Sequence, residues 1–121
     1  MSPDASERRS SQSPVEVALA KLAQRMLSSR IVKKSSIVIH ATGAGGGDYY
    51  LACSPGAVKL TKTAALPATV EVTVTAKQLP QVLAGERDPR KLFFAGGLRV
   101  RGDLRYLSDL AMELGILKEP I

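Results

Sequence analysis

The sequence predicts an α+β fold: a five-stranded, mainly antiparallel sheet with helices packed on one face. Alternating, β-branched stretches separated by turn residues are concentrated between residues 35 and 76. Apolar stripes with helical spacing lie mostly outside that region, and such segregation is typical of α+β proteins. A length of 121 residues with 45% hydrophobic residues is sufficient for one domain with a single core.

The first folded element is expected to be a helix from Pro14 to about Ser28. Ser13 can cap it, Pro14 suits the first helical position and Glu16 completes a capping box. Its apolar stripe comprises Val15, Leu19, Leu22 and Met26. The polar residues 1–12 are expected to be a disordered tail, and residues 13–121 a single domain.

Four strands should follow. Residues 35–41 and 49–54 read as a hairpin around the glycine-rich loop TGAGGGD, and AVKLT follows the turn Ser54-Pro55-Gly56. The fourth stretch, ATVEVTVTA, alternates most regularly, so that one face carries Val70, Val72 and Val74. These early hairpins favour antiparallel pairing.

Helical spacing returns after the fourth strand. Residues 77–84 should form a helix that starts late or loses a hydrogen bond, because it contains Pro80. A short helix then begins at Asp88-Pro89, carries both phenylalanines and ends at Gly96-Gly97.

A fifth strand, LRVR, should direct Leu98 and Val100 inward and Arg99 and Arg101 outward. Asp103 can cap the last helix, which should run to about residue 114 and stop at Gly115. Its expected apolar stripe comprises Leu104, Leu107, Ala111 and Leu114.

Several kinds of chemistry lack the residues that they require. The glycine loop 43–47 fits neither a dinucleotide fingerprint nor a P-loop, so a flexible hairpin is favoured. One histidine and one cysteine predict no metal site, no cofactor and no catalysis, although a dyad of Cys53 and His40 across the hairpin is an alternative. The lone cysteine and the lack of an export signal or of a run of about 20 apolar residues favour a cytoplasmic protein.

The net charge of +6 indicates an acidic partner, such as nucleic acid, an anionic membrane or an anionic ligand. Nucleic acid is disfavoured, because the five aromatic residues form no RNA-binding strand motif. The apolar faces of the predicted helices and strands remain as candidate binding surfaces. Phe93 and Phe94 point about 100° apart on a helix, so one can fill the core while the other needs a partner or lines a cavity. On the apolar residues alone, a plain core is favoured over a cavity.

The stretch ERDPRKLFFAGGLRVRGDLRYLSDL resembles the C-terminal signature of the sterol carrier protein type 2 (nonspecific lipid-transfer) family. A glycine ends a helix, Asp-Pro follows, and a strand runs into Gly-Asp and an apolar helix. ATVEVTVTAKQLPQVLAG also resembles the family's strand-into-helix segment. The sequence LFF followed by LRVRGD is most similar to a bacterial branch that assists ubiquinone biosynthesis.

The resemblance implies a non-catalytic carrier with an apolar tunnel between the sheet and the helices. The ligand would be a fatty acyl, sterol-like or isoprenoid quinone-type lipid, and further partners would be an anionic membrane surface or lipid-metabolising proteins. A protein-interaction module with the same fold but no ligand, or a nucleic-acid-binding domain, are the alternatives. The expected lipid-binding residues are Val70, Val72, Val74, Leu83, Phe93, Phe94, Leu104, Leu107, Ala111 and Leu114.

Overall fold

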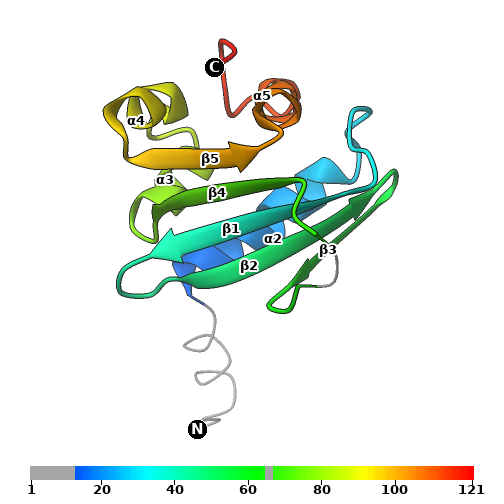
Figure 1. The fold of residues 1–121 in the computed structure, drawn as a ribbon, viewed down its shortest axis with the longest axis horizontal. Helices are drawn as coiled ribbons and strands as arrows, with labels where there is room; N and C mark the ends of the chain where they lie inside the picture. The colour runs from blue at the N-terminus through cyan, green and yellow to red at the C-terminus, as the bar shows by residue number, and fades with distance from the viewer. Residues whose placement is uncertain (1–12, 65–66) are drawn as a thin grey trace, which may run out of the picture.

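The computed structural model describes residues 13–64 and 67–121, so the tail expected at 1–12 lies outside the described residues. The chain forms four helices and five strands in this part (Figure 1). In order they are α2 (Pro14–Met26), β1 (Ser35–Thr42), β2 (Gly47–Ser54), β3 (Ala57–Thr61), β4 (Val70–Thr75), α3 (Gln78–Leu83), α4 (Pro89–Ala95), β5 (Leu98–Gly102) and α5 (Leu104–Glu113).

The five strands form one mixed, mostly antiparallel sheet in the order β3-β2-β1-β4-β5. The pairs β1/β2, β2/β3 and β4/β5 are antiparallel, which confirms the expected fold class. The central pair is parallel, with Ile37 opposite Val70 and Ile39 opposite Val72. After β3, at one edge of the sheet, the chain crosses over β2 and β1. It then forms β4 on the other side of β1, running in the same direction as β1.

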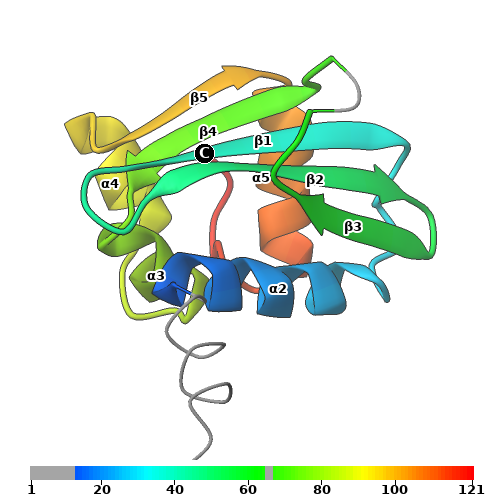
Figure 2. The same ribbon diagram turned by 90° about the horizontal axis from the view of Figure 1, so that it is seen from below.

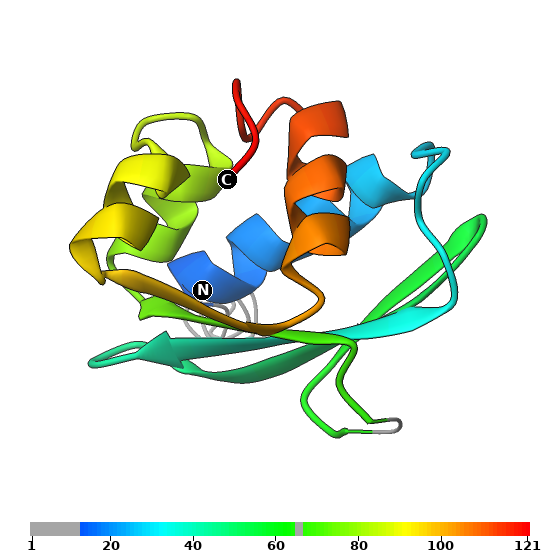
Figure 3. The same ribbon diagram turned by 45° about the horizontal axis from the view of Figure 1, so that its top comes forward.

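The helices cover one face of the sheet, and the opposite face carries no helix within residues 13–64 and 67–121 (Figures 2 and 3). On β4 burial follows the strand alternation, so that Val70, Val72 and Val74 are buried as expected. On α2 the predicted stripe Val15, Leu19, Leu22 and Met26 is buried as well. The core therefore lies between the sheet and its single helical layer.

Local sequence explains where most helices begin. Ser13 Oγ accepts a hydrogen bond from the Glu16 amide at 3.2 Å, and α2 ends at Met26, two residues before the expected Ser28. Pro80 is the third residue of α3, in its first turn. The N–H groups of a first turn have no partner within the helix, so a proline there costs no helical hydrogen bond. Asp88 caps α4, and Gly96 ends it with a φ of 84°.

Every helix in the described part of the chain is too short or too polar to span a bilayer. The longest, α2, has 13 residues.

Candidate functional site

An apolar cavity of about 100 Å³ lies between the sheet and the helices. The sheet contributes side chains from β1, β2, β4 and β5, among them Ile39, Leu51 and Val72. The opposite wall comes mainly from α2, α3 and α5, and α4 contributes Pro89. Because these elements are far apart in the sequence, the cavity exists only once the helical layer has closed over the sheet.

The lining of the cavity is almost entirely hydrocarbon. Among its residues in the described part of the chain, Ser108 is the one polar side chain, and none is charged. An unpaired charge in such surroundings carries a large desolvation cost. The cavity therefore suits an apolar group, whose transfer from water is favourable by roughly 25 cal/mol per Å² buried.

Six of the ten expected lipid-binding residues line this cavity. Val72 and Val74 do so from β4 and Leu83 from α3, whereas α5 supplies Leu107, Ala111 and Leu114. The buried face of β4 and the apolar stripe of α5 therefore line the same cavity.

The other four expected residues lie outside this cavity. Val70 is fully buried in the core, and Leu104 and Phe93 are half-buried. Phe94 is 68% exposed, with its ring edge-on to that of Phe93 at a centroid distance of 5.6 Å. The reason is that α4 lies against β5 and directs Leu92 inward, which leaves Phe94 facing solvent.

Several residues that close the cavity were not predicted from the sequence. On α5 the most deeply buried residues are Tyr106, Ser108 and Leu110, which lie on either side of the predicted stripe. A hydrophobic spacing of four from Tyr106 to Leu110 was the available signal. The segment after α5 also reaches the cavity, through Ile116, Leu117 and Ile121.

Arg25 joins the three helices that surround the cavity. From α2, its guanidinium donates to the Leu83 carbonyl at 3.4 Å and to the Leu114 carbonyl. Both carbonyls stand at helix C-terminal ends, where they lack helical partners. A mostly apolar groove of about 540 Å³ between α2 and α3 also shares Leu22 and Leu83 with the cavity wall. Arg25 therefore stabilises the closed arrangement.

The alternative dyad of Cys53 and His40 is wrong. In the β1/β2 register Cys53 lies opposite Ser35 and His40 opposite Asp48, and the two side chains are on opposite faces of the sheet. Cys53 is buried on the helical side, where burial raises the pKa of its thiol.

His40 lies on the helix-free face in a cluster with two carboxylates. Its Nδ1 is 2.7 Å from Asp48 Oδ1 and its Nε2 is 3.0 Å from Glu71 Oε1. The hydrogen bonds to Glu71 and then to Asp48 raise the pKa of His40. The cluster joins β2, β1 and β4 across the sheet, and it does not contact the cavity.

Comparison with known proteins identifies the family to which this fold belongs. The model of the SCP-2 sterol transfer family matches residues 16–114. The chain therefore belongs to the SCP-2 sterol transfer family. No curated protein sequence matches the chain significantly.

Solved structures show the same fold. Domain 2 of the sterol carrier protein of Helicoverpa armigera is 20% identical, with a TM-score of 0.70 over 91% of this chain and 94% of that one. A protein described as "UbiJ-SCP2 Ubiquinone synthesis protein" is also 20% identical, with a TM-score of 0.61 over 78% and 90% of the two chains. Sterol carrier protein 2 like 2 from Aedes aegypti is 16% identical, with a TM-score of 0.65 over 81% and 94%.

Proposed function

We propose that this chain binds and carries a hydrophobic lipid without catalysing a reaction, and that the lipid occupies the apolar cavity. The observation that supports this most strongly is the cavity itself: it lies between the sheet and the helical layer of an SCP-2 family fold, and its lining has no charged side chain among the described residues. Candidate ligands are fatty acyl, sterol-like and isoprenoid quinone-type lipids.

The cavity must widen to hold such a ligand. Its 100 Å³ is well below the roughly 300–1,000 Å³ of ordinary small-molecule sites. The helical wall is the part that can move, because each of its helices is bound to the sheet through side chains, whereas the strands share a backbone hydrogen-bond ladder. In this proposal α5 and α3 separate from α2 when lipid enters, which requires Arg25 to release at least one of its two carbonyls.

The proposed carrier works in the cytoplasm and meets an anionic membrane. Arg99 and Arg101 are exposed on β5, and neither pairs with a carboxylate within residues 13–64 and 67–121. The ubiquinone synthesis protein among the structural neighbours makes an isoprenoid quinone precursor a candidate ligand.

A protein-interaction module is the second candidate, and two observations favour it. The cavity is small, and Phe94 presents an aromatic ring to solvent beside Arg90, whose guanidinium carbon is 5.5 Å from the ring centroid. Aromatic and arginine side chains are enriched at protein interfaces.

Native mass spectrometry with hexadecanol, farnesol and cholesterol tests the proposal. Leu107→Trp should fill the cavity, whereas Met112→Trp places the same ring on the exposed side of the same helix. We expect a one-to-one lipid complex for the wild type and for Met112→Trp, and its loss in Leu107→Trp at an unchanged melting temperature. A wild-type protein that binds none of these lipids would instead favour the interaction module.

A further inference from the structure

The segment that follows α5 folds back into the cavity. Gly115, with a φ of 77°, ends the helix. The amides of Ile116 and Leu117 both donate hydrogen bonds to the Ala111 carbonyl, at 2.9 and 3.1 Å. The chain then passes between α5 on one side and α3 and α4 on the other (Figure 3). Ile116, Leu117 and Ile121 of this segment line the cavity. They occupy apolar space that an alkyl chain could otherwise fill.

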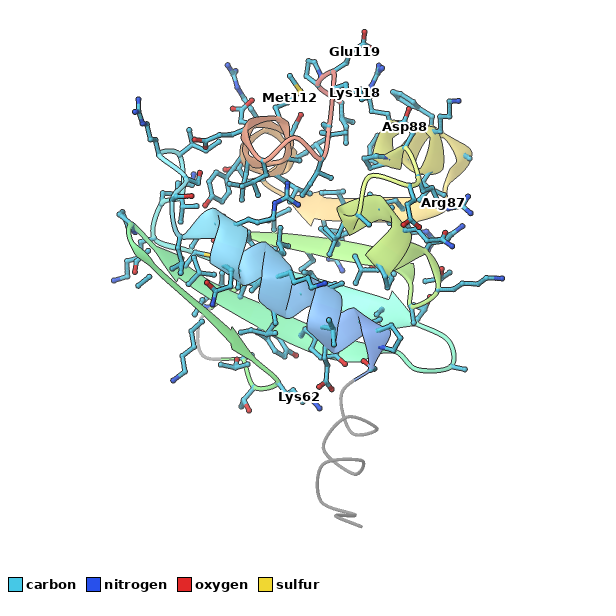
Figure 4. The ribbon with its side chains drawn as sticks, turned by 180° about the vertical axis from the view of Figure 1, so that it is seen from behind. Lys62, Arg87, Asp88, Met112, Lys118 and Glu119 are labelled. Carbon is cyan, nitrogen blue, oxygen red and sulfur yellow. The ribbon has the colours of Figure 1, made fainter. Side chains whose placement is uncertain are left out.

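Two polar contacts hold this segment in place. Arg90 Nη1 of α4 is 2.6 Å from a carboxylate oxygen of Glu119, in an exposed ion pair. The Ile121 amide donates to Ser108 Oγ of α5 at 3.1 Å. Figure 4 shows Lys118 and Glu119 between Met112 of α5 and Asp88 at the start of α4. Exposed ion pairs contribute about 0–1 kcal/mol, so this segment is weakly held compared with the strands.

Ser108 is unusual for its position. It is 4% exposed and lines the cavity, yet apolar residues surround it. A buried hydroxyl without a partner costs roughly 1–3 kcal/mol, and here the Ile121 amide is a partner. If this segment leaves the cavity, Ser108 Oγ loses that donor and needs another.

We propose that a lipid replaces the segment 115–121 and that an uncharged oxygen of the lipid replaces the Ile121 amide on Ser108. A hydroxyl group can donate to Ser108 Oγ as that amide does, and a carbonyl can accept from the serine hydroxyl. No charged side chain among the described lining residues could pair with a carboxylate or phosphate in the cavity. The inference rests on the proposed lipid-binding function, and it narrows the ligand to neutral lipids with a hydroxyl or carbonyl group.

Paired ligands test the role of Ser108. Hexadecanol and hexadecane share an alkyl chain and differ by one hydroxyl, and each can be titrated against the neutral probe N-phenyl-1-naphthylamine bound to the full chain. Ser108→Ala frees the segment for both ligands but removes the partner of the lipid hydroxyl for hexadecanol alone. It should therefore lower the ratio of the hexadecanol affinity to the hexadecane affinity about 5- to 10-fold, the equivalent of one hydrogen bond. Ser108→Thr, which keeps the hydroxyl, should restore the preference. If Ser108→Ala changed the affinities for hexadecanol and hexadecane equally, or changed neither, Ser108 would not bind the lipid oxygen.

Hydrogen exchange tests whether the segment 115–121 is displaced. The amides of Leu117 and Ile121 are hydrogen-bonded and should exchange slowly in the free protein. Saturating hexadecanol should accelerate both, and Glu119→Gln, which breaks the ion pair with Arg90, should tighten binding of both ligands. Lipid binding with these amides still protected would refute displacement while leaving the carrier function intact. If neither ligand binds at all, the proposed function fails together with this inference.

Discussion

Gly102 occupies a backbone position that other residues cannot fill at low cost. Its φ is 96°, and an added Cβ would lie 2.4 Å from the Thr69 carbonyl oxygen. β5 ends here, and α5 begins two residues later. The close approach to Thr69 lets the chain turn from the sheet edge onto the helical layer.

Gly102→Ala is therefore expected to lower the free energy of unfolding by about 1–3 kcal/mol or more, since left-handed strain and the clash with Thr69 act together. Gly56→Ala is the matched control: its φ is 78° but its Cβ would meet nothing within 4 Å. Denaturant unfolding of both variants measures the difference. A midpoint for Gly102→Ala equal to that of the control would show that the close approach costs nothing.

His40 is expected to make stability depend on pH. Because the hydrogen bonds with Glu71 and Asp48 raise its pKa, the folded state favours the protonated imidazole. The resulting stabilisation is fully present below the unfolded-state pKa of about 6.5 and is lost as the pH rises through the higher folded pKa. The difference in unfolding free energy between wild type and His40→Gln should therefore shrink as the pH is raised above about 6.5. A difference that stays constant from pH 6 to pH 9 would contradict this.

At the scale of elements, the sequence predicted what depends on local patterns. The valine alternation located β4 and its buried face, and Asp88-Pro89 with Gly96 bounded α4. It did not predict the parallel pairing of β1 with β4, because that depends on how the chain crosses the sheet after β3.

The candidate site was predicted in part for the same reason. Periodicity identifies an apolar face but leaves open how wide the buried face is and how a short helix is rotated. α4 directs Leu92 inward and leaves Phe94 exposed, and α5 buries Tyr106 and Leu110 beside the predicted stripe. Tertiary packing determines both. The segment 115–121 carries no periodic signal at all, and its place in the cavity depends on Arg90 and Ser108 from other elements.

Two leucines of α5 should respond differently to truncation. Leu110 is 3% exposed, so Leu110→Ala should create a void that costs about 2–5 kcal/mol of unfolding free energy. Both leucines line the cavity, but Leu107 is only half-buried, so Leu107→Ala removes less buried surface and should cost clearly less. Denaturant midpoints measured without ligand compare the two. Equal losses would mean that Leu107 is packed as tightly as the core.

At the scale of the whole molecule, the charge should guide the protein to anionic surfaces. The chain carries a net charge of +6, and Arg99 and Arg101 are exposed on one strand. Replacing each with glutamine should weaken binding to vesicles containing phosphatidylserine about fivefold, the equivalent of about 1 kcal/mol per basic residue. Sedimentation with neutral vesicles is the control. Unchanged binding in the double variant would exclude β5 as the membrane-facing element.

A lipid that enters the space between the sheet and the helices must perturb the side chains lining that space. Methyl-labelled NMR spectra of the wild type during a hexadecanol titration detect this, because the cavity is lined by isoleucine, leucine and valine methyl groups. We expect the largest shifts at Leu79, Leu107, Leu110 and Ile121, with saturation at one lipid per chain. Shifts confined to exposed methyl groups such as those of Val17 and Leu27, or no shifts at all, would contradict it.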